Sequence, residues 1–226
     1  LSRDGYLKKM TDRVLRKATT LKYKDGDEPF IEFDSSNTHD LLVFTNQCQV
    51  YKCKVAAFED TKSAQLGSYL PTDLEMDADE TVTWVIDPED YKADVLFVFE
   101  NGRVARVALS GYATKTNRKR LKNAIYGGSK LMYATVLKEE RDLALVSSDY
   151  RLVNFNTSLL KTKTTNSTQG VQALTIKGSR TVTMVGTAEE FIGGKAQVEK
   201  FRAEKLPSAG APMKETDMKS LFDLEE

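Results

Sequence analysis

The chain has 226 residues, enough for one large all-β domain or two ordinary domains with a sizeable core. Its 33 Lys and Arg residues are balanced by 33 Asp and Glu residues, so the zero net charge does not indicate a partner. No apolar run is long enough to span a membrane and no signal peptide is recognisable, which excludes an integral membrane protein of the helical class. Cys48 and Cys53 fit unpaired thiols in a reducing compartment, and the start at Leu1 suggests a part excised from a cytoplasmic protein.

One hairpin pattern recurs along the chain: an Asp, an apolar run, a polar corner and an alternating second strand. It is present from the corner onward in LSRDGYLKKM (1–10), and in full in HDLLVFTNQCQVYKCKV (39–55), ADVLFVFENGRVARVAL (93–109) and RDLALVSSDYRLVNFNT (141–157). Alignment places Asp40, Asp94 and Asp142 in register. The aligned corner residues are Gly5, Cys48, Gly102 and Tyr150.

A further strand precedes the hairpins. The segments are PFIEF (29–33), TVTWVI (81–86), KLMYATVL (130–137) and RTVTMV (180–185), all rich in β-branched and aromatic residues. Four units of three or four strands favour an all-β, propeller-like array of antiparallel blades that stack on one another, with a stacked β-sandwich array as the alternative. The first unit lacks its leading strand and the last lacks a hairpin, so we expect the two ends to meet.

The last part of the chain departs from the repeat. Residues 192–212 contain a glycine pair and two prolines, and we expect a strap that closes the array. Residues 213–226, with the sequence MKETDMKSLFDLEE, are acidic and predict a flexible tail with at most a short helix. The expected domain is therefore 1–212, followed by the tail 213–226.

Charge is unevenly distributed although the total is zero. Residues 1–24 hold eight Lys and Arg against two Asp, 101–138 hold nine and no acid, and 150–188 hold five and no acid. Residues 59–94 hold eleven acids and two Lys. Because the basic loops fall at equivalent places in the repeat, we expect them on one curved edge, where they could neutralise the phosphates of a duplex and favour bent DNA. A merely solvated charged face is the alternative.

The predicted DNA contacts are the cations of these loops. They are Lys8, Lys9, Arg13, Arg16, Lys17, Lys22, Arg103, Arg106, Lys115, Arg118, Lys119, Arg120, Lys122, Lys161 and Lys163. Reversing the charge of Arg118, Lys119 and Arg120 is expected to abolish most DNA binding and to leave the fold intact.

Residues suited to catalysis are scarce. His39 is the only histidine, and its place before a strand predicts a spacer. The acidic stretch DLEMDADE (73–80) fits no calcium loop and predicts a solvated turn, and the glycine pairs in YGGSK (126–130) and GGK (193–195) lack the P-loop pattern. Trp84 is expected to pack between blades. The sequence thus favours a binding module without an active site or a metal site.

Several stretches resemble the C-terminal domain of the A subunit of bacterial type IIA topoisomerases, DNA gyrase and topoisomerase IV. They are LSRDGYLKKM, DLLVFTN, DVLFVFENGRV, TTNSTQGVQALTIK and FRAEKLPSAG, whose order and spacing cover about 1–212. The resemblance implies a β-pinwheel, a propeller-like disc whose blades exchange strands and whose basic rim binds and bends duplex DNA for the strand-passage core. It further implies no catalytic residue and no cofactor here, since ATP and Mg²⁺ act elsewhere in the holoenzyme. The implied partners are double-stranded DNA, the rest of the A subunit and the ATPase B subunit, at the nucleoid in the cytoplasm.

Two features differ from the gyrase pattern. The stretch RVLRKATTLKYKDGDEP (13–29) lacks the glutamine-, arginine- and glycine-rich box of strongly wrapping gyrases, and TQGVQ (168–172) is more similar to topoisomerase IV of Gram-positive type. A topoisomerase IV-like or weakly wrapping gyrase-like protein is therefore favoured. Four repeats are counted where the family has five or six blades, so a degenerate blade in 56–80 or a small or open ring is expected.

Two other functions stay open. A propeller that binds a protein through 59–94 or the tail, without binding DNA, is the alternative to the topoisomerase module. A regulatory tail that competes with DNA for the basic rim is the second.

Overall fold

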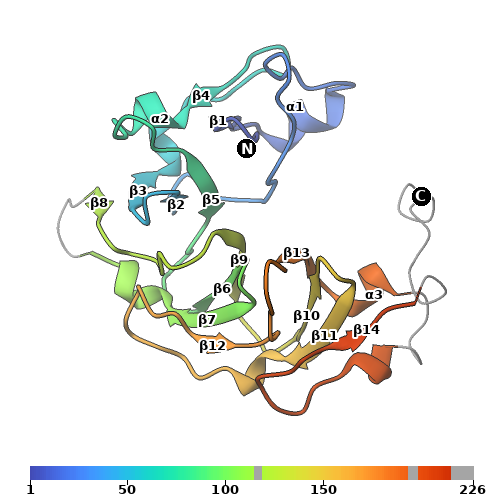
Figure 1. The fold of residues 1–226 in the computed structure, drawn as a ribbon. Helices are drawn as coiled ribbons and strands as arrows, with labels where there is room; N and C mark the ends of the chain where they lie inside the picture. Colours follow the sequence, from blue (N-terminus) through green and yellow to red (C-terminus); the bar gives the residue numbers. More distant parts are fainter. Residues whose placement is uncertain (115–118, 193–197, 215–226) are drawn as a thin grey trace. The chain divides into compact units, whose positions relative to one another are not determined.

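The computed structural model describes residues 1–114, 119–192 and 198–214, which form mostly short antiparallel strands (Figure 1). The strands are β1 (Tyr6–Leu7), β2 (Asp40–Thr45), β3 (Val50–Lys54), β4 (Ser68–Tyr69), β5 (Val82–Ile86), β6 (Asp94–Phe99), β7 (Arg103–Ala108), β8 (Arg120–Leu121), β9 (Leu131–Leu137), β10 (Asp142–Ser147), β11 (Arg151–Asn156), β12 (Val171–Gln172), β13 (Val182–Gly186) and β14 (Ala211–Pro212). The α-helices are α1 (Asp12–Lys17), α2 (Leu70–Asp73) and α3 (Ala188–Phe191). The 3₁₀ turns are η1 (Val55–Ala57), η2 (Leu109–Tyr112), η3 (Thr157–Leu159) and η4 (Glu199–Phe201).

The predicted hairpins are confirmed. β2 pairs with β3, β6 with β7 and β10 with β11, and the first strand of each begins at the aligned aspartate. Every aligned corner residue has a left-handed backbone: φ is 92° at Gly5, 58° at Cys48, 79° at Gly102 and 57° at Tyr150. Tight hairpin corners need a residue of this conformation to match the twist of the two strands. This need explains why the corners contain glycine or polar residues.

Each complete hairpin receives two more strands, giving three four-stranded sheets. Their orders are β5-β2-β3-β8, β12-β7-β6-β9 and β13-β10-β11-β14. The long strands that were expected to lead the next hairpin pair instead with the previous one: β5 with β2, β9 with β6 and β13 with β10. The grouping of RTVTMV in a last unit without a hairpin is therefore wrong, because β13 completes the sheet of the preceding hairpin, β10 and β11.

The first sheet contains only β1 and β4. PFIEF is not a strand: Pro29 forms a single antiparallel bridge with Ser2, and Phe30 and Ile31 donate backbone hydrogen bonds to Leu1. The expected degenerate blade in 56–80 is also wrong, since that segment supplies the edge strand β4 and the helix α2.

The chain divides into two compact units. The first contains 1–92 and 112–127, and the second contains 93–111 and 128–226. In the first unit, Leu7, Leu41, Val43, Tyr51 and other apolar residues form one cluster that joins β1 to the sheet β5-β2-β3-β8. Trp84 on β5 lies edge-on to the ring of Phe30, with 5.1 Å between centroids. Stacked sheets thus share a core, as expected for blades that cannot bury both faces alone.

In the second unit, the two four-stranded sheets pack through Leu96, Val98, Leu145, Val153 and neighbouring apolar residues. The predicted strap is part of the fold rather than a cover: β14 pairs with β11, and Met213 and Phe201 pack in one cluster on the sheet β13-β10-β11-β14. The tail beyond 214 lies outside the described residues. Within the described part of the chain, no helix is long and apolar enough to cross a membrane.

Candidate nucleic-acid interface

The first group of predicted contacts lies on or near α1. Arg13, Arg16 and Lys17 project from a helix that buries none of its residues, and all three are exposed. The placement of charges along the helix is favourable. Asp12 lies in the first turn, and Arg16 and Lys17 lie in the last turn, where the helix dipole favours cations. These side chains are therefore available to an anionic partner.

The neighbouring lysines differ. The Lys8 ammonium group donates to the carbonyl of Gln65, and burial, then the charge of Lys22, lowers the pKa of Lys8. Lys9 is only 20% exposed and lies 3.3 Å from an Asp60 carboxylate oxygen. Lys22 is exposed. The side chains of Lys8 and Lys9 thus bind other segments of the chain.

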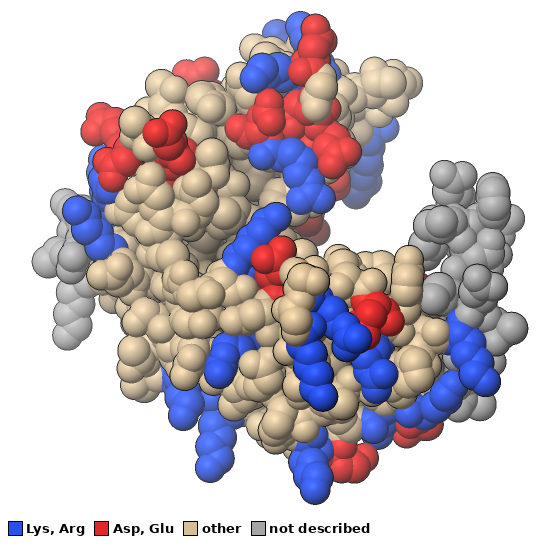
Figure 2. Space-filling model, in the orientation of Figure 1, with Lys and Arg blue, Asp and Glu red and all other residues tan. Residues whose placement is uncertain are grey.

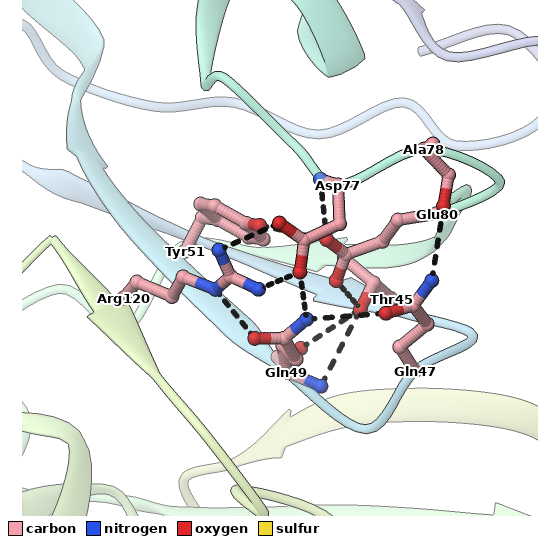
Figure 3. Close-up of polar contacts among 8 residues, drawn as sticks. All are labelled: Thr45, Gln47, Gln49, Tyr51, Asp77, Ala78, Glu80 and Arg120. Atoms are coloured by element: carbon pink, nitrogen blue, oxygen red, sulfur yellow. Dashed lines mark hydrogen bonds and ion pairs between the residues drawn. The ribbon is translucent and has the colours of Figure 1, made fainter.

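Arg120 lies on the edge strand β8 and is the centre of a polar cluster (Figure 3). Its guanidinium group pairs with Asp77 and donates to Gln49, and it lies over the ring of Tyr51. The hydrogen bond from Arg120 holds the pKa of Asp77 below its ordinary value. Asp77 and Glu80 belong to the loop before β5, so Arg120 attaches β8 to that loop.

The acidic stretch 73–80 is therefore more than a solvated turn. Glu80 is buried and accepts hydrogen bonds from Tyr51 and Thr45. Burial, followed by the hydrogen bond to Glu80, raises the pKa of Tyr51 to about 12. His39 is likewise not a spacer, because its Nδ1 lies 2.8 Å from Asp87.

The other cations of the 115–122 stretch divide into two groups. Lys119 and Lys122 are exposed and form no hydrogen bond or ion pair through their side chains with the residues that the structure describes. Lys115 and Arg118 lie outside the described residues.

In the second unit, the arginines of β7 are structural. Arg106 is 18% exposed, with its Nε 2.6 Å from Asp94 and an Nη 2.8 Å from Glu140. Arg103 donates to the carbonyl of Gly170 at 3.3 Å. Lys161 and Lys163 are exposed, and the backbone of Lys163 is fixed by hydrogen bonds with Arg106 and Ala108.

Eight predicted contacts are thus exposed cations whose side chains form no hydrogen bond or ion pair with the described part of the chain. They are Arg13, Arg16, Lys17, Lys22, Lys119, Lys122, Lys161 and Lys163. Figure 2 shows Lys and Arg side chains along the lower edge of the view, over the part that holds β12 and β11 in Figure 1. The expected common edge for Arg16, Arg120 and Lys163 spans both units and stays a prediction.

Four further exposed lysines share these properties and were not predicted: Lys62, Lys130, Lys177 and Lys205. Lys177 lies in the acid-free stretch 150–188, so the charge pattern could have identified it. Lys205 is exposed beside Glu204, and no pattern in the sequence distinguishes it.

The thiols do not form a reactive site. Cys48 and Cys53 are both unpaired, as predicted. Burial, followed by the charge of Asp40, raises the pKa of Cys53 to about 12, and burial raises that of Cys48. Among the described residues, no group of three or more His, Cys, Asp and Glu side chains is arranged to hold a metal ion.

No protein-family model matches the chain. The sequence is 28% identical to the A subunit of DNA topoisomerase 4 from Bacillus subtilis (strain 168) over 125 residues, which is 54% of this chain and 16% of that protein. It is 24% identical to the corresponding protein of Staphylococcus epidermidis over 190 residues, 81% of this chain and 24% of that protein. The chain therefore spans less than a quarter of the length of these relatives.

Solved structures have the same fold. The E. coli ParC C-terminal domain matches with a TM-score of 0.71 at 17% identity, over 96% of this chain and 93% of that chain. The C-terminal domain of DNA topoisomerase IV matches with a TM-score of 0.69 at 22% identity, over 85% and 61%. The DNA gyrase A C-terminal domain matches with a TM-score of 0.62 at 16% identity, over 96% and 78%. The chain is thus similar in sequence to the A subunit of bacterial topoisomerase IV, and its fold is the β-pinwheel of the C-terminal domains of topoisomerase IV and gyrase A.

Proposed function

We propose that this chain is the DNA-binding part of a type II topoisomerase A subunit, and that it binds and bends duplex DNA for the strand-passage core. The observation that carries the proposal is the likeness to the topoisomerase IV A subunit over 81% of the chain, together with the shared fold. The chain has no catalytic role in this proposal. Strand cleavage, ATP and Mg²⁺ belong to other parts of the A subunit and to the B subunit.

The exposed cations support DNA as the partner. A lysine without an intramolecular carboxylate partner can neutralise a phosphate, and the counterions that the DNA then releases drive sequence-independent binding. Lys161 and Lys163 in the second unit are exposed lysines without a carboxylate partner among the described residues. The same is true of Lys119 and Lys122 in the first unit. A neutral protein can therefore bind a polyanion through part of its surface.

A matched pair of variants tests DNA binding. Lys161→Glu with Lys163→Glu should lower the affinity for duplex DNA by about tenfold or more at moderate salt, and should flatten the salt dependence by about one phosphate contact per lysine. Lys62→Glu with Lys92→Glu is the control, since both lysines are exposed and lie in the acidic stretch 59–94.

The measurement is fluorescence anisotropy with a labelled duplex over a series of salt concentrations. Equal losses in both variants would show that only the net charge matters. Absence of DNA binding by the parent chain would favour the protein-binding alternative.

Bending has its own test. Ligase-catalysed circularisation of a duplex of about 150 bp, one persistence length, should be faster with the protein present. An unchanged rate with bound protein would exclude bending. A plasmid topology assay with a nicking-closing enzyme would then report the hand of any wrapping and separate gyrase-like from topoisomerase IV-like behaviour.

A further inference from the structure

The segment 160–163 follows η3 and lies along the edge of β7. The backbone N–H of Lys163 donates to the carbonyl of Arg106 at 2.8 Å, and the carbonyl of Lys163 accepts from the N–H of Ala108 at 2.9 Å. Leu160 is extended, with φ of −99° and ψ of 120°, and its side chain is buried in the core between the two four-stranded sheets of the second unit. The segment is therefore extended and fixed to the sheet at both ends.

Thr162 fixes the middle of this segment. Its hydroxyl donates to a carboxylate oxygen of Asp94 at 2.6 Å, and the same oxygen lies 2.6 Å from the Nε of Arg106. Successive side chains of an extended chain point to opposite sides. Lys161 and Lys163, the exposed neighbours of Thr162, therefore lie together on the side that faces away from Asp94.

Two other sheets have a segment with the same backbone placement. Lys9 and Asn154 lie four positions after their hairpin corners, as Arg106 does. The carbonyl of Lys9 accepts from the N–H of Thr61 at 2.6 Å, and that of Asn154 accepts from the N–H of Ala203 at 2.7 Å. Thr61 and Ala203 are thus the counterparts of Lys163.

The residue before each of these donors, here called the anchor residue, is held through its side chain. The anchor Asp60 lies 3.3 Å from the ammonium group of Lys9, and the anchor Arg202 lies 2.6 Å from Asp142, the first residue of β10. Thr162 is the third anchor residue. Of the three, only Thr162 has a lysine on each side in the sequence.

The carboxylates near Thr162 already have partners. Arg106 pairs with Asp94 and, through an Nη, with Glu140 at 2.8 Å. Glu140 also accepts a hydrogen bond from the hydroxyl of Thr157 at 2.7 Å. The two lysines of the segment pair with no carboxylate among the described residues, so their charges are available to a ligand.

We propose that Thr162 is a positioning residue for DNA binding, which holds Lys161 and Lys163 on one side of a fixed backbone to bind neighbouring phosphates of one DNA strand. The two lysines are about 6.6 Å apart along the chain, twice the rise per residue of an extended strand. A backbone that is already ordered loses less conformational entropy when it binds. This role rests on the proposed function, because a duplex is the ligand.

Three variants without a change of charge test the role. Thr162→Val removes the hydroxyl and should weaken binding of a labelled duplex about threefold or more, because the segment must then be ordered on binding. Thr162→Ser keeps the charge-assisted hydrogen bond to Asp94 and should stay within about twofold of the parent chain. Thr164→Val is the control, since Thr164 is exposed and its hydroxyl forms no hydrogen bond with the described residues. Fluorescence anisotropy over a salt series measures all three.

Two further measurements separate positioning from direct contact. Thr162→Val should have little additional effect on DNA binding when Lys161→Glu and Lys163→Glu are already present, because the hydroxyl acts through these lysines. Without DNA, Thr162→Val should speed amide hydrogen exchange of Lys163 about tenfold, since its bond to Arg106 opens more often.

Three results would overturn the proposal. DNA affinity of Thr162→Val equal to that of the parent chain would show that the lysines need no anchor residue. Equal losses with and without the two lysines would show that Thr162 contacts DNA itself. Absence of DNA binding by the parent chain would refute the proposed function, and faster exchange in Thr162→Val would then leave the hydrogen bond to Asp94 as a contribution to the fold alone.

Discussion

Arg120 and Lys122 lie two residues apart in one basic stretch, yet their side chains have different surroundings. The sequence could predict that both are cations in a loop, because a run of charged residues is visible in the amino-acid sequence. It could not predict that Asp77, more than forty positions away, forms an ion pair with Arg120, whereas Lys122 forms none with the described residues. Ion pairs between distant segments depend on the register of the strands, which charge counts do not contain.

This difference gives a prediction for single variants. Arg120→Gln should lower Tm, because Asp77 and Gln49 lose their shared partner, whereas Lys122→Gln should leave Tm unchanged and weaken DNA binding. Thermal unfolding and anisotropy titration measure the two effects. The expectation that a triple reversal including Arg120 spares the fold is no longer supported. A Lys122 variant that unfolds earlier than the Arg120 variant would refute this assignment.

The surroundings of Asp40 lead to a prediction of how the stability of the fold changes at acidic pH. Burial raises the pKa of Asp40, but hydrogen bonds from Lys54 and Tyr91 outweigh burial, so the net shift is downward. A carboxylate with a lowered pKa stabilises the fold above its unfolded pKa of about 4, and this contribution is lost as the pH falls further. Urea unfolding should therefore show falling stability below about pH 4.

The matched variants are Asp40→Asn and Asp25→Asn. The first should be less stable at neutral pH and lose less stability on acidification. The Asp25 side chain is exposed and has no partner in the described part of the chain, so its variant should follow the parent curve. Parallel acid curves for the parent and Asp40→Asn would contradict the role of this carboxylate.

At the scale of elements, the hairpins were predictable and the edge strands were not. The aligned aspartates and the apolar runs after them identified where β2, β6 and β10 begin, because a strand that is buried on both faces has a continuous apolar sequence. The two-residue strands β4, β8, β12 and β14 have no such pattern. For three of these strands, a preceding glycine was the available signal. Gly67, Gly170 and Gly210 lie directly before β4, β12 and β14, with φ of 93°, 64° and 64°.

These glycines carry a prediction with a close control. A Cβ on Gly170 would lie 2.0 Å from the carbonyl oxygen of Val104, so Gly170→Ala should cost well over about 1 kcal/mol. Gly178 has nearly the same φ, 63°, but nothing within 4 Å of its Cβ position, so Gly178→Ala should cost only about 1 kcal/mol. Chemical denaturation measures both. Equal costs would show that backbone conformation alone decides.

At the scale of the molecule, the sequence predicted stacked sheets but not their division into two compact units. The repeat describes each sheet and is silent on which sheets share a core. Residues 112–127 follow a hairpin of the second unit yet belong to the first, where they supply β8. A contact of this kind depends on the path of the chain in space, and local periodicity does not record it.

Tyr112 tests this assignment. It is fully buried, lies edge-on to Phe44 with 5.9 Å between ring centroids, and donates a hydrogen bond to the carbonyl of Ala124. Tyr112→Ala should cost about 3–5 kcal/mol and Tyr112→Phe about 1 kcal/mol. Hydrogen exchange should locate the loss of protection in β2, β3 and β5. Equal loss in β10 and β11 would contradict the division into units.

The late arrival of the edge strands has a consequence for synthesis on the ribosome. The hairpin that ends at Lys54 cannot complete its sheet until Leu121 has emerged, and those that end at Ala108 and Asn156 wait for Gln172 and Pro212. A growing polypeptide therefore presents an unfinished sheet edge to its neighbours on a polysome through most of its synthesis. Translation pauses shortly before these residues should increase misassembly between nascent chains, and pauses after them should not.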